Sequence, residues 1–233
     1  QSLGVLERMA RDGVRAICLT PHLEASRITE GPPPAHDEAF ALLAPKAPPA
    51  ITLHRGAEIL LDRRLTPRVV ATRRVTLAGS RYVLVEFTRL VSLPAATAAL
   101  KEVLAAGLVP LLAHPERYAA CSVGTVRSWR EAGALMQVDA TTVFQPTARG
   151  QKARELLATG QADVLASDNH GDTRALPEIF ERLGALGTNA ATMLMVDNPA
   201  AILADGSPEM VPPVEVKLDL GGRVRSWWGR VRE

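Results

Sequence analysis

Short apolar runs alternate with helical segments along most of this chain, and this alternation restricts its possible folds more than any other feature. Six runs have the composition of buried strands, at residues 14–20, 50–61, 81–87, 108–114, 134–140 and 162–168. Six segments show helical spacing of apolar residues, at residues 2–12, 94–107, 123–133, 148–161, 173–187 and 190–204. Strands that are apolar along their whole length are typical of a parallel sheet covered by helices. The sequence therefore predicts an α/β fold.

The order of these units favours a closed sheet. The sequence contains no Gly-x-Gly-x-x-Gly and no Gly-Lys-Ser/Thr phosphate loop, which are typical of nucleotide-binding open sheets. Repeated strand–helix units without such loops are typical of a TIM-like barrel. Residues 21–36, which include three consecutive prolines, predict a loop, and Gly56 marks a bulge or a close approach within its strand.

The last part of the chain differs in composition from the rest. We expect residues 1–204 to form the barrel, and residues 205–233 to form a linker and a basic tail. The tail carries four arginines around Trp227 and Trp228. A short basic segment with tryptophans can contact a membrane surface weakly, and a disordered or partner-docking tail is the alternative.

Charge and cysteine content limit the cellular setting. The chain has 27 basic and 25 acidic residues, and this near balance argues against a general nucleic-acid binder. Two cysteines, Cys18 and Cys121, do not make a disulfide framework, so a reducing compartment is expected. No apolar run approaches the roughly 20 residues that span a bilayer. We therefore expect a cytoplasmic protein that does not bind nucleic acid.

Residues able to bind a metal ion follow the predicted strands. Because all strands of a parallel barrel end at the same mouth, these side chains are expected to converge there. His36 and His54 do not share this placement, and they are interpreted as solvated and structural, respectively. The converging residues are His22 after the first strand, Glu58 at the second, Glu86 at the third, His114 at the fourth, and Asp168 and His170 after the sixth.

The types of these residues point to metal chemistry. A single histidine after a strand is more often a hydrogen-bonded loop residue, and "SDNH" on its own is compatible with a turn. Glu86 is harder to explain in this way, because burying an unpaired carboxylate costs several kcal/mol and requires a cation nearby. Carboxylate and imidazole ligands together suit manganese, iron or zinc. Clustered ions favour displacement at a phosphate ester, and Arg117 and Arg174 are placed to hold its oxygens.

A thiol mechanism is the competing interpretation of the same region. Cys121 and Arg127 have the Cys-x5-Arg spacing of thiol-dependent phosphatases. In those enzymes the motif joins a strand directly to a helix, and its backbone amides bind the phosphate. Here "HPERYAA" separates Cys121 from the preceding strand, and Arg127 lies within a helical pattern. We therefore interpret Cys121 as a small loop residue.

Five motifs resemble those of a known superfamily. They are "TPHLE" (20–24), "GAEILL" (56–61), "VLVEF" (83–87), "AHPER" (113–117) and "ASDNH" (166–170). Together they are similar to the polymerase-and-histidinol-phosphatase (PHP) superfamily, and more narrowly to its bacterial capsule and exopolysaccharide type of metal-dependent protein tyrosine phosphatase. The resemblance extends from residue 1 to about residue 204.

The resemblance implies a specific fold and activity. It implies a distorted (β/α)7 barrel, two or three metal ions, usually Mn2+ with iron or zinc as alternatives, and hydrolysis of phosphotyrosine on protein. The substrate would include a membrane tyrosine kinase of polysaccharide export. It implies phosphate contacts for Arg117 and Arg174. It implies metal-ligand roles for His22, Glu58, Glu86, His114, Asp168 and His170.

One departure from the family is visible. The family opens with an Asp-x-His-x-His strand and a loop with a further metal-binding Asp, and neither occurs here. We expect this chain to form the barrel without its first strand, and to bind fewer ions and turn over more slowly than a chain with that strand. Two other functions stay open: a phosphatase for histidinol phosphate or another small phosphomonoester, and a non-catalytic binding protein.

Overall fold

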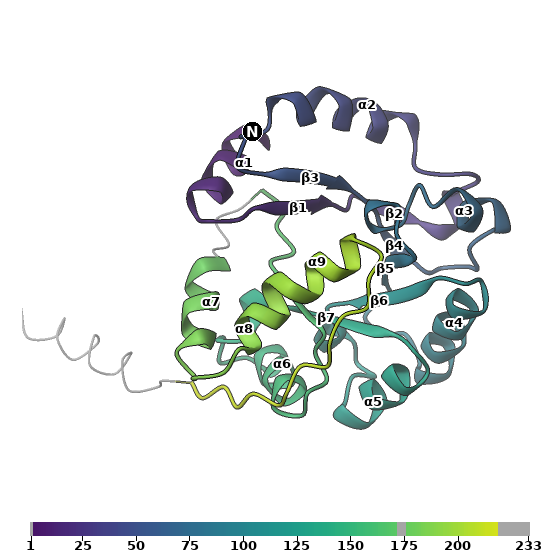
Figure 1. Cartoon of the computed structure of the whole chain (residues 1–233). Helices are drawn as coiled ribbons and strands as arrows, with labels where there is room; N and C mark the ends of the chain where they lie inside the picture. The colour runs from purple at the N-terminus through teal and green to yellow at the C-terminus, as the bar shows by residue number, and fades with distance from the viewer. Residues whose placement is uncertain (1, 172–175, 219–233) are drawn as a thin grey trace, which may run out of the picture.

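The computed structural model describes residues 2–171 and 176–218, and it shows a mixed α/β fold with parallel sheets (Figure 1). Neighbouring strands run parallel in both sheets, which confirms the predicted class. The smaller sheet pairs β1 (Ala16–Leu19) with β3 (Thr52–Arg55). The larger sheet has six strands in the order β2 (His22–Glu24), β4 (Glu58–Leu60), β5 (Tyr82–Glu86), β6 (Val109–Ala113), β7 (Leu135–Asp139) and β8 (Val164–Ala166).

The two sheets meet at a break near Gly56. The sequence predicts one strand over 50–61, but the structure divides this run into β3 and β4, which belong to different sheets. Backbone hydrogen bonds continue across the break: the Gly56 N–H donates to the Leu19 carbonyl at 3.0 Å, and the Glu58 N–H donates to the Pro21 carbonyl at 3.1 Å. The bulge or close approach expected at Gly56 therefore marks the point where the second half of the segment passes into the larger sheet.

The predicted loop at 21–36 contains a short strand, the 3-10 turn Ala25–Arg27 and the start of a helix. Its start forms the three-residue strand β2, and its end begins helix α2 (Pro34–Leu43). Pro34 is tolerated there because the first helical residues need no N–H donor within the helix. The prolines therefore set where α2 begins, and do not exclude a helix.

The expected closed barrel is not observed among the described residues. Closure would require the two outer strands to pair, but there β1 pairs only with β3, and β8 pairs only with β7. Consecutive residues of both strands instead line a cavity of about 780 Å³, to which α1 (Ser2–Arg11), α2 and α9 (Asn198–Leu203) also contribute. The sheets are therefore open where a barrel would be closed.

Helices cover the larger sheet at the positions that the sequence predicts. The caps follow the expected chemistry, because the side chains of Ser92, Ser122 and Thr147 each accept a hydrogen bond from the first turn of the following helix. Gly107 lies just after one of these helices with a φ of 81°, which confirms it as the stop signal. The helices are α4 (Leu93–Ala105), α5 (Val123–Glu131) and α6 (Ala148–Ala158), and α3 (Pro67–Thr72) lies between β4 and β5 in the chain.

The C-terminal part packs on the same hydrophobic core as the larger sheet. Helices α7 (Leu176–Gly184), α8 (Ala190–Thr192) and α9 follow β8, with a π-helical turn at Met193–Asp197. Residues 205–218 form no helix or strand, yet Val211 and Val214 are buried in the hydrophobic core. The segment interpreted as a linker is therefore packed against the fold. Trp227 and Trp228 lie outside the described residues. None of the helices described here is both long and apolar enough to cross a membrane.

Replacing Gly56 by alanine should destabilise the fold. A Cβ at this position would lie 3.0 Å from the Cys18 sulfur and 3.0 Å from Leu77 Cδ2, closer than ordinary contact. We expect Gly56→Ala to lower the free energy of unfolding by about 1–3 kcal/mol, measured by urea denaturation. Gly4→Ala is the matched control, since nothing lies within 4 Å of a Cβ there, and it should stabilise α1 by about 0.5–1 kcal/mol. Equal effects of the two substitutions would contradict the close approach.

Candidate metal centre and phosphate site

Strand register brings four of the six predicted ligands together. His22 pairs in register with Glu58 between β2 and β4, and Leu60 pairs with Glu86 between β4 and β5. Neighbours in register on a parallel sheet point to the same face, and residues two apart on one strand share that face. His114 directly follows the end of β6, the next strand along. Four consecutive strands thus each supply one polar side chain to the same region.

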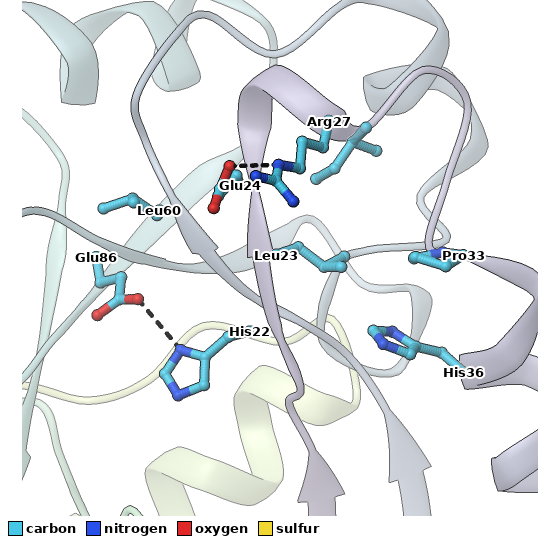
Figure 2. Close-up of a pocket in the computed structure, with 9 residues that line it drawn as sticks. His22, Leu23, Glu24, Arg27, Pro33, His36, Leu60 and Glu86 are labelled. Atoms are coloured by element: carbon cyan, nitrogen blue, oxygen red, sulfur yellow. Dashed lines mark hydrogen bonds and ion pairs between the residues drawn. The ribbon is translucent and has the colours of Figure 1, made fainter.

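In this region two imidazoles alternate with two carboxylates. His22 Nδ1 lies 3.2 Å from Glu86 Oε1 (Figure 2) and 3.5 Å from Glu58 Oε2. His114 Nε2 lies 3.0 Å from Glu58 Oε1 and 3.7 Å from Glu86 Oε2. Each carboxylate therefore faces both histidines. We call these four residues the His–Glu cluster.

The fifth and sixth candidates approach from the loop after β8. His170 Nε2 lies 3.2 Å from His22 Nε2, and the two rings are stacked with centroids 5.5 Å apart. His170 Nδ1 contacts the Asp168 backbone carbonyl at 2.9 Å, which orients the ring. The Asp168 carboxylate is turned toward Arg117. His170 therefore joins the His–Glu cluster directly, while Asp168 borders it.

The residues present fit a divalent cation. His22, Glu58 and Glu86 each offer a ligand atom, and these atoms lie within 4.8 Å of one another. Glu58 is only 3% exposed and Glu86 is partly buried, and two carboxylates this close repel each other unless a positive charge compensates them. Mixed imidazole and carboxylate donors are the set that manganese, iron and zinc accept. The cluster is therefore a candidate metal centre.

The motif "HPER" places an arginine beside this centre. His114 has a left-handed φ of 36°, and the 3-10 turn Pro115–Arg117 follows it, so the chain folds back over the strand end. Arg117 Nη2 donates to Asp139 Oδ2 at 2.9 Å and also to Asp168 Oδ2. Although burial lowers the pKa of Arg117, its hydrogen bonds to Asp139 and Asp168 raise it above its usual value. Arg117 is thus a permanent cation next to the candidate metal ligands.

Arg174, the other predicted phosphate contact, lies outside the described residues.

The structure places two further acidic residues at the site, which the sequence analysis does not assign to it. Asp139 ends β7, the one predicted strand to which no ligand was assigned, and Glu116 lies inside the recognised "HPER" motif. Burial raises the pKa of Glu116 to about 7, and its Oε1 accepts a hydrogen bond from the Asp139 N–H at 3.1 Å. An acidic residue closing an apolar strand was the signal available for Asp139.

A pocket of about 450 Å³ opens next to the His–Glu cluster (Figure 2). Two members of the cluster, His22 and Glu86, line it. His36, interpreted from the sequence as solvated, is half-buried and lines this pocket. The pocket is large enough for a flat apolar group beside a charged one. Its remaining lining residues are Leu23, Glu24, Arg27, Ile28, Pro33 and Leu60.

Cys121 lacks the features of a nucleophile. It is buried, and burial raises the pKa of its thiol to about 11. Activated thiolates have pKa values well below the ordinary value of about 8.5. The interpretation of Cys121 as a packed loop residue agrees with this environment.

Residues 1–204 match the family described as capsular polysaccharide synthesis, CpsB/CapC. The chain therefore belongs to the CpsB/CapC family, and the resemblance inferred from its motifs is confirmed.

Named relatives support this placement. Tyrosine-protein phosphatase CpsB of Streptococcus pneumoniae is 28% identical over 221 residues, which cover 88% of this chain and 90% of that protein. CpsB of Streptococcus agalactiae serotype V is 25% identical over 219 residues, covering 87% and 90%. The fold resembles, with a TM-score of 0.72 and 23% identity, a crystal structure described as YwqE from Bacillus subtilis and CpsB from Streptococcus pneumoniae, unique metal-dependent tyrosine phosphatases. This match covers 93% of this chain and 91% of that one.

The cysteine environment makes a direct chemical prediction. At pH 8, a thiol with a pKa of about 11 is only about 0.1% thiolate, so iodoacetamide should leave Cys121 unmodified in the folded protein. The same reagent should alkylate both Cys18 and Cys121 within minutes in urea. Intact-mass spectrometry over time distinguishes these states. Rapid modification of Cys121 in the folded protein would restore the thiol mechanism.

Proposed function

We propose that this chain is a metal-dependent phosphatase that hydrolyses phosphotyrosine on protein and regulates capsule or exopolysaccharide synthesis. The observation that supports this most is the His–Glu cluster with Arg117 at its border. Two relatives carry the name tyrosine-protein phosphatase, and the family is described by capsular polysaccharide synthesis. Family membership and site geometry therefore lead to the same reaction class.

The residues have distinct roles in this proposal. His22, Glu58, Glu86 and His114 hold the metal, with His170 and Asp168 completing the ligand set. When bound, divalent ions of this kind neutralise charge on a phosphate ester and lower the pKa of water. Arg117 orients the phosphate oxygens through its guanidinium N–H groups. The apolar side chains of the pocket, among them Leu23 and Leu60, receive the aromatic ring and exclude water from it.

Several finer assignments belong to the same proposal. We propose Mn2+ as the ion, with two or three ions per chain and with iron or zinc as alternatives. Arg174 is the second phosphate contact, and a membrane tyrosine kinase of polysaccharide export is the substrate protein. The catalytic unit is residues 1–204, located in the cytoplasm, and the basic tail contacts the membrane surface weakly.

Substrate comparison tests the proposal. The chain, with Mn2+ added, is assayed against a tyrosine-phosphorylated peptide, a serine-phosphorylated peptide of the same sequence, and histidinol phosphate. We expect the phosphotyrosine peptide to be preferred, with activity abolished by chelation and restored by Mn2+. Preference for histidinol phosphate would show the small-molecule alternative. Binding of the phosphotyrosine peptide without turnover would show the non-catalytic alternative.

His114→Ala tests the metal centre itself. The substitution removes an imidazole in contact with both carboxylates, so kcat/KM should fall by about 100-fold or more, and Mn2+ affinity measured by calorimetry should fall with it. His54→Ala is the matched control, because His54 lies on β3 outside the cluster, and its activity should stay within about threefold of the parent.

Cys121→Ala provides the opposite control. Its activity should stay near that of the parent chain. An inactive but folded Cys121→Ala together with an active His114→Ala would reverse the mechanism.

A further inference from the structure

Asp139 is a buried carboxylate at the site that the proposed mechanism does not yet use. It is the last residue of β7 and is 3% exposed. Its side chain points to the same end of the sheet as the candidate metal ligands, since it contacts Arg117. A carboxylate this buried is tolerated only where charge and hydrogen bonds compensate it.

The position of Asp139 is fixed from several sides. Its Oδ1 accepts hydrogen bonds from the Thr141 N–H at 3.0 Å and from the Thr141 hydroxyl at 2.6 Å. Its backbone N–H donates to the buried Glu116 at 3.1 Å. Its Oδ2 is left to accept from Arg117 Nη2 at 2.9 Å. Asp139 is therefore a rigid anchor with one oxygen directed at the guanidinium.

Arg117 needs such an anchor. The same Nη2 atom also donates to Asp168, but Asp168 is a proposed metal ligand, so its negative charge is shared with that centre. Arg117 Nε is buried and makes no hydrogen bond in the described part of the chain. Of the two carboxylates that hold the guanidinium, Asp139 is the one not assigned to the metal.

We propose that Asp139 is a positioning residue for Arg117: it fixes the guanidinium so that its other N–H donors face the phosphate of the substrate. This inference rests on the proposed function, since it assigns a task to Arg117. Glu116 and Thr141 support the task by holding Asp139. The simpler alternative is that the Asp139–Arg117 pair only stabilises the fold.

A second buried pair provides the control for that alternative. Asp163, 2% exposed, pairs with Arg130 Nη2 at 2.6 Å and also accepts from the Met136 N–H. Asp163 immediately precedes β8, so it lies at the opposite end of the sheet from the site. Asp139→Asn and Asp163→Asn remove the same charge from the same kind of pair, and both should lower the melting temperature.

The two variants should differ in kinetics. For Asp139→Asn we expect the KM for a phosphotyrosine peptide and the Ki of inorganic phosphate to rise together by about 10-fold, with a smaller change in kcat, because phosphate is held less well. Asp163→Asn should leave both constants unchanged. Unchanged KM and Ki in Asp139→Asn, or an equal rise in Asp163→Asn, would overturn the inference.

Coupling to Arg117 completes the test. In an Arg117→Ala background, Asp139→Asn should change KM and Ki no further, whereas an independent effect there would overturn the inference. If Asp139→Asn fails to fold, Thr141→Val is used instead, because it keeps the charge of Asp139 and removes the hydroxyl that holds its carboxylate. A smaller rise of KM and Ki is then expected, and no rise would overturn the inference.

Direct binding of inorganic phosphate, measured by calorimetry with Mn2+ present, separates this inference from the proposed function. If the parent chain binds phosphate and Asp139→Asn weakens this binding, but the parent hydrolyses no phosphotyrosine, only the proposed function fails. If it hydrolyses phosphotyrosine and Asp139→Asn binds phosphate as well as the parent, only the positioning role fails.

Discussion

The electrostatic interaction between Glu58 and Glu86 is the constraint on which this site depends. Both carboxylates face His22 and His114 at distances of 3.0–3.7 Å. Such an arrangement persists only where positive charge compensates the two acids. It also requires β2, β4 and β5 to keep their register, because a one-residue slip would turn a candidate ligand to the opposite face. The packed helices, the capped turns and the bend at Gly56 all preserve that register.

Much of the fold and the site was accessible from the sequence. Each predicted strand and helix that falls among the described residues has a counterpart there, because apolar runs, caps and glycine stops act locally. The bulge or close approach expected at Gly56 is where the sheet changes, but the division of this run between two sheets was not predicted, because strand pairing is not specified locally. Barrel closure was expected from the order of the units, whereas the described strands β1 and β8 border a cavity. Pairing of sheet edges is a tertiary property that local patterns do not specify.

The site, like the fold, was predicted from the sequence only in part. Residue type and strand-end position identified His22, Glu58, Glu86 and His114, which the structure brings together. Asp139 has the same strand-end placement, but the sequence does not show that its partner is Arg117 rather than a metal ion or a turn. Its importance follows from a contact between residues 22 positions apart in the chain. Roles that depend on a partner elsewhere in the chain require the structure.

The left-handed backbone of His114 has a consequence for how such proteins change over time. A φ of 36° is uncommon for a residue with a side chain, whereas glycine adopts it without steric strain. The backbone of Asp168, with a φ of 46°, is also left-handed. Selection for stability alone would therefore favour glycine at two positions where the proposed chemistry needs an imidazole and a carboxylate. Retention of these two residues in any descendant would report selection for function, because stability alone acts against them.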